Sequence, residues 1–250
     1  SPLCYTTKMK SLVIANWKMH PRTFAEAKRL LEVTKKAADR ARGATVVVAP
    51  PIVFLRDLRA HYRGKRLAFA VQNAHFEADG AYTGDTSLAQ ASDAGATWAI
   101  IGHAERRALG ETDEDISKKV SAALASKMTP VLCIGEKLRD SSGEHFEVIR
   151  RQLRSGLTGV PDSKRGKVVI AYEPVWAIGS DTAMSPHEMH EMAIFIKKTL
   201  VDAHGTLALR AHILYGGAID ATNAPDMMHR GGVEGLLVGR ASADAERFTK

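Results

Sequence analysis

Eight short apolar runs, separated by amphipathic stretches, constrain the fold of this 250-residue chain more than any other feature. The runs recur at intervals of about 20 to 45 residues, and most are apolar throughout instead of alternating with polar residues. Continuous apolar strands are typical of a parallel sheet that is covered on both faces. We therefore predict strands at residues 12–15, 45–49, 67–70, 97–101, 130–134, 167–172, 211–214 and 235–238.

Helix starts are marked between these runs. Three amphipathic stretches open with a hydroxyl residue that is followed, three positions later, by an acid or an amide, which is the pattern of a capping box. The pairs are Thr23 with Glu26, Ser87 with Gln90, and Ser185 with Glu188. Pro186 follows the third of these hydroxyls, at the first helical position, where its missing N–H costs nothing.

Strand–helix alternation repeated eight times has two main solutions, a closed barrel or an open doubly wound sheet. Eight strands in 250 residues fit the barrel better. No linker or shift of composition marks a domain boundary. The predicted fold is therefore α/β, a single-domain (β/α)8 TIM barrel at residues 10–250. Residues 1–9 are interpreted as a leader or cloning remnant, with Met9 as a candidate native start.

Composition excludes several classes of protein. Hydrophobic residues make up 45% of the chain and charged residues 25%, which is typical of a globular protein and not of a disordered one. The apolar runs are too short to cross a membrane, and no signal peptide is recognisable. Cys4 and Cys133 lack the spacing of metal ligands, so we expect free thiols in a reducing compartment, the cytoplasm.

The formal net charge of +7 is compatible with two kinds of partner, a nucleic acid or a small anion. Lysine and arginine are spread along the chain, without a block of five like charges or an interleaving of basic and aromatic residues. This distribution favours an enzyme that attracts an anionic substrate, and no nucleic-acid partner is expected.

Polar residues at strand ends are the candidates for chemistry, because active sites of α/β barrels lie where the strands end. Lys18 follows the first predicted strand, His103 the fourth and Glu173 the sixth. Taken singly, each has a plain structural interpretation: a solvated lysine, a core or surface histidine, or a carboxylate at a loop. A carboxylate after a fully apolar strand is, however, partly desolvated, which suits it to abstract a proton.

Glycines follow the last two predicted strands, at 216–217 and at 239. They fit tight turns, and they also fit backbone N–H groups that approach a phosphate, which is often bound after strands seven and eight of such barrels. A lysine, a histidine, a glutamate and two glycine turns at successive strand ends favour the functional interpretation.

From about Lys10 onward the sequence resembles the triosephosphate isomerase family. The most specific segment surrounds Glu173, and it occurs together with the segment around His103. The matching segments are 15–19 (ANWKM), 80–85 (GAYTGD), 101–107 (IGHAERR), 133–136 (CIGE), 171–179 (AYEPVWAIG) and 215–217 (YGG).

The resemblance implies an enzyme of glycolysis and gluconeogenesis that interconverts dihydroxyacetone phosphate and glyceraldehyde 3-phosphate. It assigns Glu173 as the base and His103 as the neutral electrophile that polarises the carbonyl. Lys18 is then a cation beside the substrate oxygens and phosphate, Asn16 fixes Lys18 and the substrate, and Glu105 assists as a supporting or proton-relay acid.

The resemblance also implies a lid at residues 174–184 and a phosphate site made of backbone N–H groups. No metal or organic cofactor is implied. The N–H groups belong to Gly179, Ala218, Gly239 and Arg240.

A homodimer is implied as well. The segment 80–85 matches a loop that inserts into a neighbouring subunit in this family, with Thr83 at its tip, and Asp85 is expected to pair with Arg106 across the interface. Without the resemblance, this segment is an ordinary exposed turn.

Several positions depart from the family pattern and keep alternatives open. Ala104 and Ala218 stand where serine is common, Arg240 where glycine is frequent, and His20 where asparagine is common, while the lid reads Ser-Asp-Thr at 180–182. These changes leave two further hypotheses, an isomerase of another short sugar phosphate such as a tetrulose phosphate, or a barrel without catalytic activity. Relative turnover of three- and four-carbon substrates discriminates among them.

Overall fold

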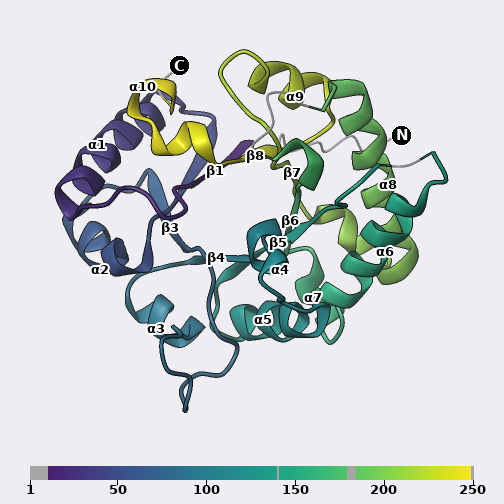
Figure 1. Ribbon diagram of the computed structural model, residues 1–250, viewed down its shortest axis with the longest axis horizontal. Helices are drawn as coiled ribbons and strands as arrows, with labels where there is room; N and C mark the ends of the chain where they lie inside the picture. Colours follow the sequence, from purple (N-terminus) through teal and green to yellow (C-terminus); the bar gives the residue numbers. More distant parts are fainter. Residues whose placement is uncertain (1–10, 140, 179–183, 249–250) are drawn as a thin grey trace, which may run out of the picture.

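A computed structural model describes residues 11–139, 141–178 and 184–248 of the chain. Its centre is a closed barrel of eight parallel strands in sequence order, with β1 pairing with β8 to close the ring. Helices surround the strands on the outside, so that the chain forms one α/β domain (Figure 1). The prediction of a (β/α)8 barrel is confirmed. The strands are β1 (Ser11–Asn16), β2 (Ala44–Ala49), β3 (Leu67–Val71), β4 (Trp98–Ile101), β5 (Thr129–Ile134), β6 (Val169–Tyr172), β7 (Ile213–Tyr215) and β8 (Gly235–Val238).

Both faces of the strands are buried, which explains why the predicted runs are apolar throughout. Along β1, Leu12 and Ile14 belong to one buried cluster, and Ala15 belongs to another. The first cluster contains side chains from all eight strands and fills the barrel, whereas the second includes residues of the surrounding helices, such as Leu31 and Ile196. The sheet is therefore a packed layer between the barrel interior and a helical shell.

The helices between the strands begin where the sequence predicted them. All three predicted capping boxes are present, at Thr23, Ser87 and Ser185. A fourth, at Thr112, opens α5. The α-helices are α1 (Phe24–Arg40), α2 (Ile52–His61), α3 (Leu88–Asp93), α4 (Ala104–Ala108), α5 (Asp113–Ala125), α6 (Glu144–Gly156), α7 (Asp162–Arg165), α8 (Pro186–His204), α9 (Ala224–Arg230) and α10 (Ala245–Phe248); the 3-10 turns are η1 (Val175–Ala177), η2 (Thr206–Arg210) and η3 (Arg240–Ala243).

Two predicted strands begin two residues too early and a third begins one residue too early. The predicted strands at 167–172 and 211–214 correspond to β6, which begins at Val169, and to β7, which begins at Ile213, while β4 begins at Trp98. The N–H groups of Val168 and Ala211 donate instead to carbonyl groups three residues earlier in the chain. These hydrogen bonds belong to the turns that end α7 and η2. Each of the two predicted strands therefore starts before the first residue that pairs with a neighbouring strand.

The segment between β3 and α3 extends away from the barrel (Figure 1). It contains Thr83 and Asp85, which are both exposed. Like every segment that follows a strand, it leaves the carboxyl edge of the barrel, so the strand-end residues predicted above meet at that edge.

Candidate active site

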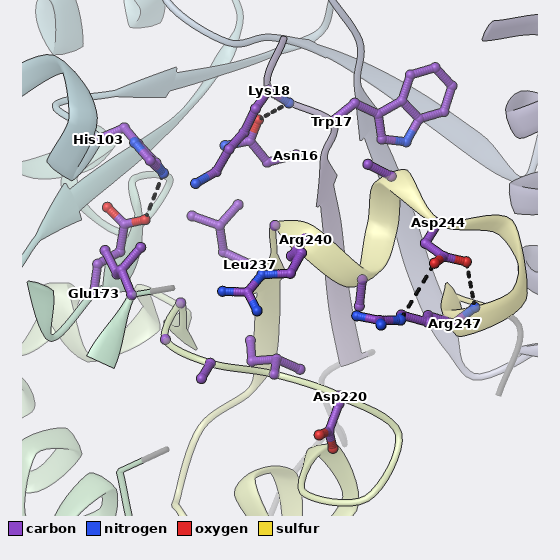
Figure 2. Close-up of a pocket in the computed structure, with 18 of the residues that line it drawn as sticks. Asn16, Trp17, Lys18, His103, Glu173, Asp220, Leu237, Arg240, Asp244 and Arg247 are labelled. Carbon is purple, nitrogen blue, oxygen red and sulfur yellow. Dashed lines mark hydrogen bonds and ion pairs between the residues drawn. The ribbon is translucent and has the colours of Figure 1, made fainter. Parts of the chain in front are cut away.

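A cavity of about 850 Å³ opens at the carboxyl edge of the barrel. This size is within the range of pockets that enclose small molecules. Side chains from separate segments of the sequence face one another across it (Figure 2). Of the predicted site residues, those that line the cavity are Asn16, Lys18, His103, Glu105, Glu173, Ala218, Gly239 and Arg240.

His103 and Glu173 are in direct contact at the bottom of the site. The distance between His103 Nε2 and Glu173 Oε1 is 3.1 Å, and the two residues are only 5% and 2% exposed (Figure 2). The second carboxylate oxygen, Oε2, accepts a hydrogen bond from the backbone N–H of Ala104 at 3.2 Å. A proton acceptor and an imidazole therefore lie side by side in a site that is largely shielded from water.

The other imidazole nitrogen fixes the protonation pattern of His103. Nδ1 accepts a hydrogen bond from the backbone N–H of Glu105 at 3.1 Å, and only an unprotonated Nδ1 has the lone pair for this bond. The remaining proton of a neutral imidazole is thus on Nε2, directed to Glu173. Burial acts to lower the pKa of His103, but the neighbouring carboxylate of Glu173 outweighs it, so that the pKa lies above its ordinary value.

Lys18 reaches the same cavity from the segment after β1. Its Nζ forms an ion pair with Glu105 Oε1 at 2.5 Å. Burial alone would raise the pKa of Glu105, but the hydrogen bond and charge of Lys18 bring it below its ordinary value. The backbone N–H of Lys18 donates to Asn16 Oδ1 at 3.1 Å (Figure 2). The Asn16 side chain therefore contacts Lys18 through the Lys18 backbone.

Glycines provide the space that Glu173 occupies. A Cβ atom on Gly216 would lie 2.9 Å from Glu173 Cγ, and one on Gly135 would lie 1.8 Å from the carbonyl oxygen of Glu173. Gly239 lies beside Lys18, but a Cβ there would be 3.4 Å from Lys18 Cε, which is ordinary van der Waals contact. Gly216, in the turn after β7, thus leaves space for the Glu173 side chain. This is in addition to any role of the turn in binding a phosphate.

Cys133, on β5, lies beside Glu173. Burial raises the pKa of its thiol well above the ordinary value, and the carboxylate of Glu173 adds to this effect. The thiol is therefore protonated at neutral pH and acts as a small buried side chain.

Glu136 belongs to the segment 133–136 that resembles the family, and no role is predicted for it from the sequence. It is buried, and its carboxylate accepts hydrogen bonds from the Tyr172 hydroxyl at 2.9 and 3.0 Å and from Trp176 Nε1 at 3.0 Å. These bonds tie η1, the first part of the expected lid, to the ends of β5 and β6. On the other side of the lid, Met184 N–H donates to the Tyr215 hydroxyl at 3.3 Å, and burial raises the pKa of Tyr215 to about 12.

Gln72, directly after β3, was also missed. Its side-chain amide donates two hydrogen bonds to backbone carbonyls at the site, one of them on Lys18. Both partners are remote in sequence, so no local pattern could have identified it.

Some predicted residues do not line the cavity. Thr83 and Asp85 are exposed on the segment between β3 and α3, and Arg106 is half-buried on α4. Gly179 and the departures at 180–182 lie outside the described residues, as do Cys4 and the predicted leader at 1–9.

Neither a metal site nor a membrane-spanning helix is found within the part of the chain that the structure describes. No group of three or more histidine, cysteine, aspartate or glutamate side chains could hold a metal ion there. No helix in the same residues has the length and apolarity needed to cross a membrane.

Comparison with known proteins shows similarity along almost the whole chain. The family model described as triosephosphate isomerase matches residues 11–250. A triosephosphate isomerase of Endomicrobium trichonymphae is 38% identical over 243 residues, covering 96% of this chain and 97% of the relative. Those of Roseiflexus sp. (strain RS-1) and Aquifex aeolicus (strain VF5) are 39% and 36% identical, with coverage of 95% or more of each chain.

Proposed function

Because the chain belongs to the triosephosphate isomerase family, and is an isomerase of dihydroxyacetone phosphate and glyceraldehyde 3-phosphate, we propose that Glu173 and His103 together carry out its proton transfers. The observation that carries this assignment is the 3.1 Å contact between His103 Nε2 and Glu173 Oε1 at the bottom of the cavity. A carboxylate and an imidazole N–H so close together can act on adjacent atoms of one small substrate.

In the first step, the Glu173 carboxylate takes a proton from C1 of dihydroxyacetone phosphate. The electron pair of that C–H bond forms a C1–C2 double bond, and the carbonyl π electrons move to the C2 oxygen. The Nε2–H group of His103 stabilises the resulting enediolate by donating to this oxygen. His103 then moves a proton between the two oxygens, and Glu173 returns its proton to C2, which gives glyceraldehyde 3-phosphate without any external reactant.

Glu173 and His103 must separate to admit the substrate, because their present contact fills the position between them. As they separate, Glu173 Oε2 gives up its hydrogen bond from the Ala104 N–H.

Lys18 supplies positive charge near the substrate oxygens and phosphate, and Asn16 fixes both Lys18 and the substrate. Glu105 forms an ion pair with the Lys18 ammonium and supports the orientation of His103 through its backbone N–H. We expect a substrate phosphate to take over part of the Lys18 interaction that Glu105 now makes.

The phosphate is held by backbone N–H groups of Ala218, Gly239 and Arg240, with Gly179 contributed by the lid at residues 174–184. Support comes from the cavity lining, which brings residues 216–220 and 239–241 to the same opening as Lys18. The Arg240 side chain is directed into the cavity (Figure 2), so it adds positive charge on this side.

A homodimer is the expected assembly. Met19, Val53, Tyr82 and Leu109 are exposed apolar side chains on segments that follow β1, β2, β3 and β4. Since these strands are neighbours in the barrel, the four side chains lie on one side of its carboxyl edge, as a subunit interface requires. In that dimer, Thr83 at the tip of its segment enters the partner subunit, and Asp85 pairs with Arg106.

The expected location is the cytoplasm, in agreement with the free, buried thiol of Cys133. A reducing compartment keeps such a thiol in its reduced form.

A coupled assay with three- and four-carbon sugar phosphates tests the substrate assignment. We expect kcat/KM for the triose phosphate to exceed that for a tetrulose phosphate by at least about 100-fold, because an additional carbon must fit between Glu173 and the phosphate site. Equal values, or absence of isomerase activity in folded protein, would overturn the assignment.

A further inference from the structure

The backbone of Lys18 has an unusual conformation that needs support. Its φ angle is +53°, and Lys127 is the only other residue besides glycines in the described ranges with a positive φ. Left-handed backbone is disfavoured for lysine, and it persists where the surrounding structure determines it. The neighbours of the Lys18 peptide groups should therefore include the groups that hold it.

Gln72 contacts Lys18 on its carbonyl side. The two hydrogens of the Gln72 carboxamide point to two different acceptors, since Nε2 is 2.8 Å from the Lys18 carbonyl oxygen and 2.8 Å from that of Ala49. The Ala49 carbonyl also accepts from Trp17 N–H at 3.1 Å. Gln72 thus links the ends of β2 and β3 to the segment that bears Lys18.

Asn16 contacts the other side of the same residue, because its Oδ1 accepts from the Lys18 N–H at 3.1 Å. The N–H and the C=O of Lys18 are therefore both held by side chains that are fixed on strand ends. With the peptide groups on either side of its Cα restrained, the direction in which the Lys18 side chain leaves the backbone is set. That direction brings Nζ into the cavity, within 2.5 Å of Glu105 Oε1.

We propose that Gln72 is a positioning residue of this isomerase, which acts by holding Lys18 in the left-handed conformation that places its ammonium in the active site. This inference rests on the proposed function of Lys18 as the cation that meets the substrate. Gln72 does not line the cavity and has no contact with Glu173 or His103 among the interactions that the structure describes. Of its two acceptors, Lys18 is the one whose side chain enters the cavity, so its proposed effect on the reaction is transmitted through Lys18.

Tyr62 offers a matched control at the other end of the same strand. Its hydroxyl accepts hydrogen bonds from the N–H groups of Arg66 at 2.8 Å and Leu67 at 2.9 Å, where β3 begins. Tyr62→Phe and Gln72→Met therefore each remove two hydrogen bonds to the backbone at one end of β3. Only the second variant releases Lys18.

The test is a comparison of kcat, KM and Tm for wild type, Gln72→Met and Tyr62→Phe with the triose phosphate. We expect Gln72→Met to lower kcat/KM by about 10- to 100-fold, because displacement of a positioned group by about 1 Å has an effect of this size. Tyr62→Phe lowers Tm but leaves kcat/KM within about twofold of wild type. In a Lys18→Ala background, Gln72→Met has no more than about a twofold further effect, since the group through which it acts is gone.

The outcomes separate this inference from the function on which it rests. A Gln72→Met protein with wild-type kcat/KM, or one whose loss persists undiminished in the Lys18→Ala background, overturns the inference and leaves the isomerase assignment intact. Wild-type activity of Lys18→Ala overturns the role of Lys18 and the inference together.

A second variant covers the case in which Gln72→Met does not fold. Gln72→Glu keeps the shape of the side chain, but an ionised carboxylate cannot donate to either carbonyl. Protonation restores one donor, so the ratio of wild-type to variant kcat/KM should decrease as the pH is lowered toward the ordinary carboxyl pKa of about 4.3. A ratio that is constant with pH, or close to one throughout, contradicts the proposed donation.

Discussion

At the scale of single residues, the site depends on glycines, which leave space for neighbouring groups, as much as on its polar side chains. Gly135 lies against the backbone carbonyl of Glu173 and Gly216 against its side chain, and a methyl group on Gly216 would come within 2.9 Å of Glu173 Cγ. Such a contact is closer than van der Waals packing permits, so the carboxylate would have to move. A catalytic base that is displaced from its substrate loses rate steeply.

Gly216→Ala is therefore expected to lower kcat by about 100-fold while the protein remains folded. Gly43→Ala is the control, because a Cβ on Gly43 would meet no atom within 4 Å. Steady-state kinetics and thermal unfolding of both variants give the comparison. If Gly216→Ala turned over at the wild-type rate, the position of Glu173 would not be governed by this glycine.

The sequence identifies site residues whose chemistry is visible in a short segment. Lys18, His103 and Glu173 each stand at a strand end, and the carboxyl edge of a barrel brings strand ends together. Gln72 could not be found in this way, because its carboxamide acts on carbonyl groups 54 and 23 residues away in the sequence. Polar side chains that bind the backbone leave no local signature, since almost any carbonyl can accept from them.

At the scale of elements, helix starts were predictable because a capping box is a purely local interaction. Strand ends were less so, because the first residues of the runs at 167–172 and 211–214 bond to preceding turns and not to a neighbouring strand. Hydrophobicity determines which residues are buried, whereas the first and last hydrogen-bonded residues of a strand depend on where its partner strands lie.

The capping box of α8 provides a test at this scale, because it anchors the helix that follows the lid. Glu188 accepts from the Ser185 N–H and hydroxyl at 2.9 and 2.7 Å, and these bonds, supported by Arg139, lower the pKa of Glu188 from its ordinary value of 4.5. A carboxyl group whose pKa is lower in the folded state stabilises the fold above its unfolded-state pKa. This contribution is lost as the pH falls through the lowered, folded-state pKa.

Glu188→Gln keeps a side-chain oxygen for Ser185 but carries no charge. The difference in unfolding free energy between wild type and this variant should reach its full value above about pH 5 and should disappear at lower pH. Urea titrations at a series of pH values measure this difference. Asp202→Asn, an exposed change near the end of the same helix, is the control and should show no such loss over this range. A wild-type advantage that grew toward acid pH would contradict the lowered pKa.

At the scale of the whole molecule, the distribution of exposed apolar side chains predicts assembly. Leu109 is 77% exposed on the carboxyl side of the barrel, whereas Leu207, 47% exposed, lies in η2 just before β7, at the opposite edge. A charge placed at the first position would be buried in the expected homodimer, and a charge at the second would remain in water.

Leu109→Glu is therefore expected to raise the dimer dissociation constant by about 100-fold or more, because an unpaired charge is costly in an interface. Leu207→Glu should leave it unchanged. Sedimentation equilibrium over a range of concentrations measures both. A wild-type protein that is monomeric at micromolar concentration would remove the basis for the dimer.

The most direct test of the proposed chemistry is the turnover of Glu173→Asp. The shorter side chain keeps the carboxylate but withdraws it by one methylene, so kcat should fall by about 100-fold or more, while the melting temperature stays close to that of wild type. Glu191→Asp makes the same chemical change outside the cavity and should retain full activity. A Glu173→Asp enzyme with wild-type kcat would contradict the assignment of Glu173 as the base that moves the proton.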